Sequence, residues 1–309
     1  MNPILIQIVL SLHISLALNA TMEDQTCKDP GTLPDTALLS FGVISDIQYC
    51  DCETMGTRHY RNSLHKLKQC LEELNRQELS FIIDLGDKIE SGLASYDSII
   101  KIYNTLDIPL FHVMGNHDYL VEDEEKSQIN ELLKIENTYY DFKLESWRFI
   151  ILDGNEISLV ANPENSPGYR RARQIYDQLK SQQAINAVEW NGAIAREQII
   201  WLKDRLKYAK EHGEKVIIFC HYPVYPEMVY NLWNNTRLLS IIGRSDNVIA
   251  YISGHNHEGD YGLSRSKHYI TFKGLVETPD EISYAIVHLF SDRIEIEGGG
   301  RESDHILYY

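Results

Sequence analysis

The sequence FIIDLGDKIE, at residues 81–90, joins an apolar run to an acidic turn. Residues 81–85 form a short, mostly apolar run that is typical of a buried β-strand, and Gly86 allows the chain to turn sharply where that run ends. Asp87 and Glu90 follow directly. A carboxylate that follows a buried strand lies at the edge of a sheet, so we interpret this stretch as part of a functional site.

The same arrangement occurs at four other places, in a fixed order. Apolar runs also lead into Asp46-Ile47-Gln48, Gly115-Asn116-His117-Asp118, Cys220-His221-Tyr222-Pro223 and Gly254-His255-Asn256-His257. Any one motif has an ordinary explanation, because Asp, Asn and Gly are common turn residues after strands. Ligands of open α/β sheets bind outside the carboxyl ends of the strands, so we expect the five motifs to share one site.

Strands that alternate with helices predict an α/β fold. We predict strands over residues 39–45, 81–85, 110–114, 147–152, 215–219 and 248–252, and helices over 59–75, 95–106 and 195–210. The tail has three further β segments, at 270–272, 285–290 and 294–296, which we expect to form a second sheet packed against the first. Residues 153–191 are polar and poorly periodic, and we interpret them as a lid or insertion with one helix over 170–179.

Composition limits the classes of partner. The chain has 309 residues, of which 43% are apolar and 24% charged, as in ordinary globular proteins. Its net charge of −16 argues against sequence-independent nucleic-acid binding, which needs a basic surface. An anionic small substrate stays compatible with this charge, because bound divalent cations dominate the field of such a site.

The N-terminus is apolar from Pro3 to Leu18 but is too short and too interrupted for a stable membrane span of about 20 residues. It resembles the apolar region of a secretory signal, with Leu18-Asn19-Ala20 as the exit, although no Lys or Arg precedes it. The alternative is a disordered or alternative-start extension. We expect residues 1–20 to be a signal peptide or extension, 21–38 a linker, and 39–309 a single domain. The protein would be secreted in the first case and cytoplasmic in the second.

The five cysteines are odd in number and irregular in spacing, so we do not expect a disulfide framework. Cys50 and Cys52 are interpreted as incidental thiols, because zinc-binding pairs have two to four residues between them. Asn234-Asn235-Thr236 is a glycosylation sequon that matters only if the chain is secreted. His112 lies inside an apolar strand and is interpreted as structural.

Aspartate, histidine and amide oxygens are the ligands expected for Mn²⁺, Zn²⁺ or Fe²⁺ at a hydrolytic centre. Two such ions about 3.5–4 Å apart clamp the attacking and leaving oxygens of an in-line displacement at phosphorus. One carboxylate must bridge the ions to keep that spacing, and Asp87 is the natural candidate. The five motifs together therefore predict a two-metal centre that hydrolyses bonds to phosphorus.

From about Phe41 to Arg301, the motif series resembles the calcineurin-like metallophosphoesterase superfamily. The resemblance is closer to its manganese-dependent ADP-ribose/CDP-alcohol diphosphatases, through residues 41–48, 56–64, 188–192, 197–198 and 274–278. The first motif separates this diphosphatase group from the rest of the superfamily. Most of the superfamily has Asp-x-His there, whereas this chain has Asp46-x-Gln48, as the diphosphatase group does. The resemblance implies two packed mixed β-sheets flanked by helices, an α/β/β/α sandwich.

The resemblance also implies the metal ligands. One ion would take Asp46, Gln48, Asp87 and His257, and the other would take Asp87, Asn116, His221 and His255. The neutral amide of Gln48 favours Mn²⁺ or Mg²⁺ over Zn²⁺. His117 would lie over the substrate phosphate as a general acid or as a cation, with Glu90 orienting it. Arg58 and Arg61 are candidates for bidentate contacts to a phosphate, or else residues of a solvated helix start.

The activity we predict is hydrolysis of the phosphoanhydride in a nucleoside diphosphate conjugate such as ADP-ribose or a CDP-alcohol. The products would be a nucleoside monophosphate and a phosphorylated moiety. Two alternatives stay open. One is a phosphodiesterase or phosphomonoesterase with the same centre, because the pocket rather than the metals selects the leaving group. The other is a non-catalytic binding scaffold, whose signature would be the loss of ligands.

Overall fold

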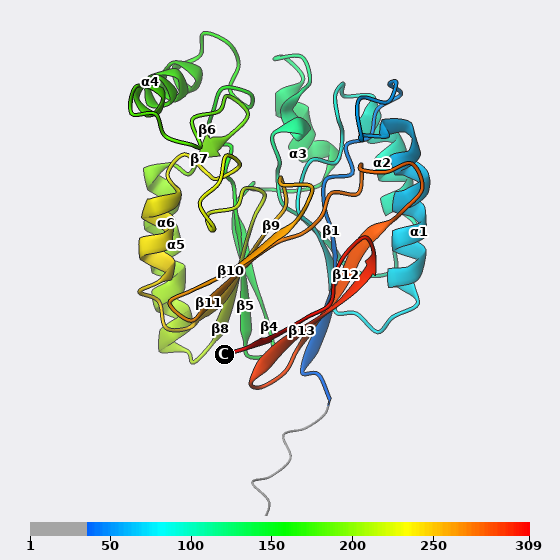
Figure 1. The fold of residues 1–309 in the computed structure, drawn as a ribbon, viewed down its shortest axis with the longest axis vertical. Coiled ribbons are helices and arrows are strands. Elements are labelled where there is room, and N and C mark those ends of the chain that lie inside the picture. The colour runs from blue at the N-terminus through cyan, green and yellow to red at the C-terminus, as the bar shows by residue number, and fades with distance from the viewer. Residues whose placement is uncertain (1–35) are drawn as a thin grey trace, which may run out of the picture. The chain divides into compact units, whose positions relative to one another are not determined.

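Two six-stranded mixed β-sheets packed face to face form the centre of the computed structural model, which describes residues 36–309 (Figure 1). The first sheet has the order β14-β13-β12-β1-β2-β3. Its strands are β1 (Leu39–Ile44), β2 (Phe81–Asp84), β3 (Leu110–His112), β12 (Ser283–Leu289), β13 (Arg293–Gly300) and β14 (His305–Tyr308). β1, β2 and β3 run parallel to one another, whereas β12, β13 and β14 are added antiparallel.

The second sheet has the order β10-β11-β9-β8-β5-β4. Its strands are β4 (Tyr140–Leu144), β5 (Trp147–Leu152), β8 (Lys215–Cys220), β9 (Val248–Ser253), β10 (Asp260–Ser264) and β11 (Lys267–Thr271). The four central strands are parallel, and β4 and β10 are antiparallel edges. The carboxyl ends of β1, β2 and β3 in one sheet, and of β8 and β9 in the other, therefore each meet at one edge.

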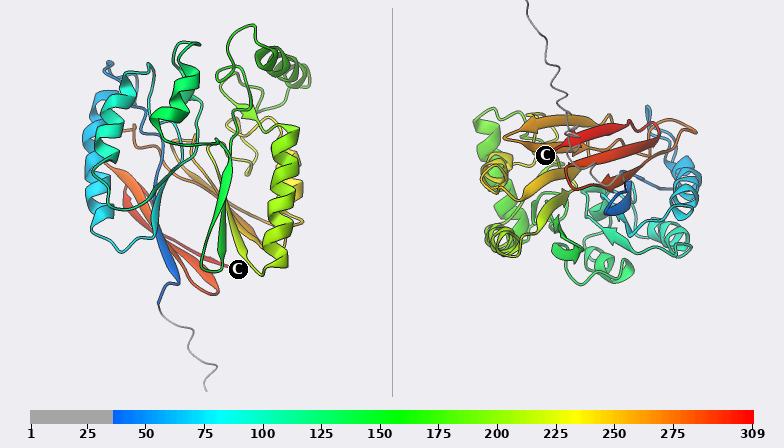
Figure 2. Two further views of the ribbon diagram at one scale, coloured as in Figure 1. Left: turned by 180° about the vertical axis from the view of Figure 1, so that it is seen from behind. Right: turned by 90° about the horizontal axis from the view of Figure 1, so that it is seen from below.

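Helices cover the outer face of each sheet, as the view from below in Figure 2 shows. The helices α1 (Ser63–Asn75) and α2 (Ser95–Tyr103) pack on the first sheet, and α5 (Arg196–Glu211) and α6 (Asn235–Ile242) pack on the second. The α/β/β/α sandwich that was predicted is confirmed. The remaining elements are the 15-residue helix α4 (Pro167–Ser181) and six short ones: η1 (Tyr60–Asn62), η2 (His117–Tyr119), η3 (Lys126–Gln128), α3 (Ile129–Leu132), β6 (Ile157–Ser158) and β7 (Gly192–Ala193).

The pattern of β1 explains this layering. Successive side chains of a strand point to opposite faces. Phe41 and Val43 therefore enter the core between the sheets, while Ile44 joins the cluster beneath α1. The ring of Phe41 stacks on Phe81 of β2 at 4.8 Å and meets Phe149 of the second sheet edge-on at 5.8 Å. Such aromatic pairs contribute about 0.5–1.5 kcal/mol each beyond the area they bury.

The prediction that the β-rich tail forms a separate sheet is wrong. β11 joins the second sheet beside β9, whereas β12, β13 and β14 extend the first sheet from β1. Strand patterns record which residues are buried but not which strand lies next to which, so the pairing could not be read from the sequence. The helix predicted over 170–179 is α4, which begins three residues earlier at Pro167, after a Ser166 cap.

The predicted signal peptide or extension, residues 1–20, and residues 21–35 of the predicted linker lie outside the described residues. Among residues 36–309, no helix is both long enough and apolar enough to cross a lipid bilayer. The side chain of the sequon residue Asn234 is used within the fold. Its Nδ2 donates to the Ile194 carbonyl at 2.8 Å, and its Oδ1 accepts from the Ile194 amide at 3.3 Å.

Candidate metal centre

The sandwich brings the five motifs together where the two sheets meet. Asp46 and Asp87 follow strands of the first sheet, whereas His221 and His255 follow strands of the second. The carboxylate of Asp87 lies 3.2 Å from Nε2 of His221, and Asp87, His221 and His255 offer ligand atoms within 4.8 Å of one another. All three side chains are buried. Residues more than 160 positions apart thus share one site.

The backbone around these residues is unusual. The predicted ligands Asp46, Gln48, Asp87 and His255 all have positive φ, between 43° and 69°. Non-glycine residues rarely adopt this left-handed region, and such strain is concentrated at functional sites. Gly115 is required here, because a Cβ at that position would lie 2.1 Å from Oδ1 of Asp87.

The two oxygens of Asp87 have separate partners. Oδ1 accepts a hydrogen bond from the His117 amide at 2.7 Å, and Oδ2 faces His221 and, at 3.3 Å, the side-chain amide of Gln48. Burial favours the neutral acid, but the attraction of His221, His117 and His255 together outweighs it and holds the pKa of Asp87 well below its usual range. This carboxylate therefore stays ionised, as a group shared between two cations must.

The imidazoles of His221 and His255 have their outer nitrogens fixed by hydrogen bonds. Nδ1 of His221 lies 2.9 Å from the Leu85 carbonyl, which only accepts. Nε2 of His255 lies 3.0 Å from Oδ1 of Asn191, whose Nδ2 donates to the carbonyls of Asn186 and Val229. Both outer nitrogens therefore donate, and the inner nitrogens face the site, where each offers a lone pair when its imidazole is neutral.

His257 and Asp46 form the other half of the site. Nε2 of His257 is 3.3 Å from Oδ1 of Asp46, while its Nδ1 bonds Glu277 at 2.7 Å. Burial opposes protonation of His257, but Asp46 and Glu277 outweigh it and raise its pKa to about 9. A carboxylate behind a histidine in this manner fixes the tautomer and raises the basicity of a metal ligand.

Buried acceptors without partners indicate that cations belong here. Within residues 36–309, Oε1 of Gln48 and Oδ1 of Asn116 are enclosed and accept no hydrogen bond. An unsatisfied buried polar atom costs about 1–3 kcal/mol, and a divalent cation would satisfy acceptors of this kind. The oxygen and nitrogen donors present therefore fit a pair of divalent ions such as Mn²⁺.

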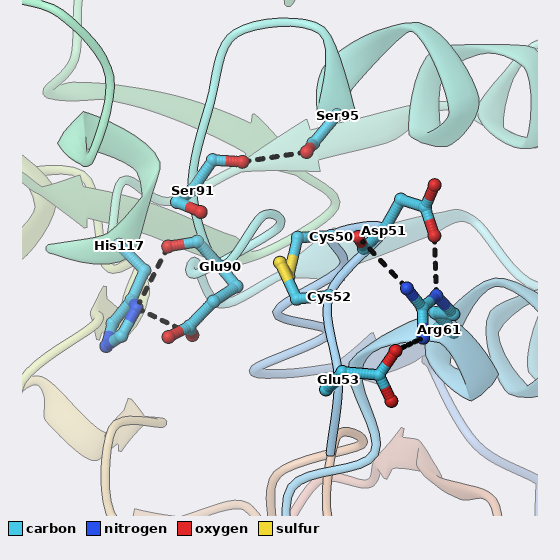
Figure 3. Close-up of a disulfide and its surroundings, with 9 residues drawn as sticks. All are labelled: Cys50, Asp51, Cys52, Glu53, Arg61, Glu90, Ser91, Ser95 and His117. Atoms are coloured by element: carbon cyan, nitrogen blue, oxygen red, sulfur yellow. Dashed lines mark hydrogen bonds and ion pairs between the residues drawn. A yellow bond between two sulfur atoms is a disulfide. The ribbon is translucent and has the colours of Figure 1, made fainter. Parts of the chain in front are cut away.

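His117 follows Asn116, and its amide donates to Asp87. Figure 3 shows its imidazole facing Glu90. Nδ1 of His117 is 3.0 Å from the Glu90 carboxylate and 3.4 Å from its carbonyl oxygen. Burial opposes protonation of His117, but Asp87 and Glu90 outweigh it and raise its pKa. The raised pKa favours the protonated imidazole, in which Nδ1 is tied to Glu90 and Nε2 is left for a substrate.

Of the two arginines predicted to contact a phosphate, only one lies near the site. Arg58 stays near the site, with Nε 3.8 Å from the Glu277 carboxylate. Arg61 is instead paired with Asp51 at 2.5 Å and Glu53 at 2.7 Å on the exposed loop that precedes it (Figure 3). Its guanidinium is therefore used to order that loop.

The interpretation of Cys50 and Cys52 as incidental thiols is wrong. They form a disulfide within the same loop, as Figure 3 shows, and the buried Cys50 contributes to a small cluster with Tyr60 and Val276. A single residue between two cysteines is too few for a zinc clip, but it does not prevent a disulfide between them. Cys70 and Cys220 are free and buried.

Three further residues hold the site in place and were assigned no role from sequence. Asn191 and Glu277 bond the histidines, and Asp118 accepts from the amides of Gly115 at 2.9 Å and Asp87 at 3.1 Å. Asp118 is balanced by the buried ammonium of Lys88 at 3.3 Å. Asp118 belongs to the third motif, and Asn191 and Glu277 lie in segments 188–192 and 274–278, but sequence alone does not indicate which side chain a given acceptor faces.

Comparisons with known proteins agree with this geometry. The calcineurin-like phosphoesterase family model matches residues 39–259. A Mus musculus protein named manganese-dependent ADP-ribose/CDP-alcohol diphosphatase is 31% identical, over 88% of this chain and 94% of its own. An Arabidopsis thaliana protein of the same name is 28% identical, over 88% and 97%. The crystal structure of a dimetal phosphatase from Danio rerio is 26% identical and superposes with a TM-score of 0.79, over 88% of this chain and 99% of that one.

Proposed function

This chain belongs to the calcineurin-like phosphoesterase family, and we propose that it hydrolyses the phosphoanhydride bond of nucleoside diphosphate conjugates, with ADP-ribose and CDP-alcohols as substrates. One water is consumed, one P–O–P bridge breaks, and a nucleoside monophosphate and a phosphorylated product leave. The observation that carries the proposal is the complete donor set with Gln48 at the first motif, in a chain whose relatives are named for this reaction.

The enzyme would use two divalent ions, and Mn²⁺ is the favoured metal. Asp46, Gln48, Asp87 and His257 would hold one ion, and Asp87 would share the other with Asn116, His221 and His255. Two amide oxygens, from Gln48 and Asn116, favour Mn²⁺ or Mg²⁺ over Zn²⁺, which prefers imidazole and thiolate. When bound, such a pair activates water and stabilises the negative charge that develops at phosphorus.

The protein's own groups would supply the remaining steps. His117, held protonated beside Glu90, would donate a hydrogen bond or a proton to a phosphate oxygen as the bridge breaks. Arg58 lies close enough to the His257–Glu277 pair to contact a second phosphate of an extended substrate. A diphosphate offers two adjacent phosphates, and the site offers cationic groups for both.

The test is a panel of substrates with protein reconstituted in Mn²⁺. ADP-ribose and CDP-choline would be compared with p-nitrophenyl phosphate, a monoester, and bis-p-nitrophenyl phosphate, a diester. We expect AMP from ADP-ribose and CMP from CDP-choline, each at a higher kcat/KM than either ester. Turnover of the monoester or the diester alone would replace this proposal with the corresponding esterase. An Asp87→Asn variant is the control for contaminating phosphatases and should be inactive throughout.

A further inference from the structure

A cavity of about 620 Å³ lies away from the metal centre, between α2, β3 and the segment that follows α3. Its lining contains none of the predicted metal ligands and neither His117 nor Glu90. The volume falls within the range of sites that hold small organic ligands, which is about 300–1,000 Å³. The cavity is therefore large enough for a ligand and separate from the phosphoesterase chemistry.

The walls of the cavity are mainly apolar. Ile100 and Leu106 line it from the α2 side, and Leu132 and Ile135 line it from the α3 side. The lining has two charged side chains, the cation Lys134 and the anion Glu136, so its net charge is zero. A neutral ligand with an apolar body matches this lining better than an anion such as a nucleotide.

His112 gives the cavity a buried polar side chain. The residue is only 7% exposed and lines the cavity from β3. Its backbone is fixed, because its amide donates to the Tyr140 hydroxyl at 3.1 Å and its carbonyl accepts from that hydroxyl at 3.0 Å. Among residues 36–309, the enclosed Nδ1 has no hydrogen-bond partner, and the Asp84 carboxylate lies 3.9 Å from it.

The state of the imidazole follows from these surroundings. Burial, together with the nearby Lys88 ammonium, holds the pKa of His112 well below its usual range, so the ring is neutral. The carboxylate of Asp84 favours the tautomer with the proton on Nδ1. The other nitrogen, Nε2, is then an acceptor on a residue that lines the cavity. A ligand needs one hydrogen-bond donor to satisfy it.

We propose that this cavity binds a neutral, flat ring compound that donates one hydrogen bond to Nε2 of His112, of the class of an aromatic alcohol. The ring centroids of Tyr103 and His112 are 5.6 Å apart. Those of Phe111 and Tyr140, which line the same cavity, are 6.3 Å apart. Aromatic side chains in this number favour a planar ligand, which stacks against one ring and meets another edge-on. The site is additional to the proposed diphosphatase activity and does not depend on it.

The experiment compares 2-naphthol with its methyl ether, which has the same rings but no donor. Binding of both to the full chain in Mn²⁺ would be measured by saturation-transfer NMR and by fluorescence titration. We expect saturable binding of 2-naphthol, about five- to tenfold tighter than that of the ether, which is the ratio that one net hydrogen bond supplies. No saturable binding of 2-naphthol up to about 1 mM, the limit of useful weak affinity, would overturn the proposal.

Two variants locate the ligand independently. Leu132→Trp fills the cavity and should weaken 2-naphthol binding at least tenfold, whereas His112→Phe keeps an apolar ring and should bind both probes alike. Asp87→Asn, in the metal centre, should bind 2-naphthol as the wild type does. Thermal unfolding of each variant checks that it is folded. Retained binding in Leu132→Trp, or a retained preference for 2-naphthol in His112→Phe, would place the probe elsewhere and contradict the proposal.

Discussion

The imidazoles of His221 and His255 face each other, with Nε2 of His221 3.1 Å from Nδ1 of His255. Because their outer nitrogens donate to Leu85 and Asn191, only one proton or one metal ion can lie between the two lone pairs. Asp87 outweighs burial and raises the pKa of His221 to about 9, while burial and His221 hold the pKa of His255 well below its usual range. Without metal, one proton takes the place of the cation.

Metal binding should therefore release protons. His221 and His257 both have a pKa of about 9 in the metal-free site, so both are protonated at pH 7 and must lose that proton to bind a metal. Metal affinity should rise as the pH approaches 9 and level off above it. Calorimetric titration with Mn²⁺ in two buffers of different ionisation enthalpy should give a release of about two protons at pH 7. Identical heats in both buffers would show that the histidines are already neutral.

The hydrogen bond between Glu277 and His257 should control metal affinity. Glu277→Gln keeps the shape of the side chain but removes the charge that orients and polarises the imidazole, and loss of such a partner weakens metal binding about 10–100-fold. Glu281→Gln removes an exposed carboxylate a few residues away and should leave affinity unchanged. Competition with a metal-sensitive dye measures both variants. Equal affinities would mean that Glu277 only packs against the site.

Gln48 should determine which metal is preferred. Gln48→His replaces an amide oxygen by an imidazole, so the variant should retain more Zn²⁺ than the wild type after dialysis against equal concentrations of Zn²⁺ and Mn²⁺. Elemental analysis of the dialysed protein gives the ratio directly. Gln178→His adds an exposed histidine on α4 and controls for adventitious binding. A ratio that does not change would show that Gln48 is not a ligand.

His117 should act on the substrate rather than on the metals. His117→Ala should lower kcat about 10²–10⁴-fold, the usual contribution of a positioned acid, with the metal content unchanged. Glu90→Gln should have a smaller effect of the same kind, because His117 keeps its carbonyl contact with residue 90. His212→Ala, at an exposed histidine at the end of α5, is the matched control. Unchanged turnover in His117→Ala would remove this residue from the mechanism.

The sequence predicts those residues of the centre that directly follow the end of a strand. The apolar runs before Asp46, Asp87 and His221 give strand ends, and parallel strands bring those ends to one edge. Asn191 and Glu277 could not be predicted in the same way, because their roles depend on which histidine each one faces. Which histidine each of these side chains faces is set by the packing of the two sheets.

Two other predictions failed for related reasons. The tail strands β12 and β13 have the same apolar pattern whichever sheet they join. Their sheet is set by hydrogen bonding of β12 to β1 and of β13 to β12. The Cys50–Cys52 bond joins near neighbours, and spacing rules for disulfide frameworks and metal clips do not describe such a pair. In both cases the missing information is a contact rather than a residue type.

The measurement that tests the central claim most directly is a titration of metal-free protein with Mn²⁺, in which bound metal and release of AMP from ADP-ribose are followed together. We predict that turnover saturates at two ions per chain, that AMP and a phosphorylated ribose form in equal amounts, and that Asp87→Asn abolishes turnover. Full activity with no metal or with one ion per chain, or release of inorganic phosphate in place of AMP, would contradict a two-metal diphosphatase.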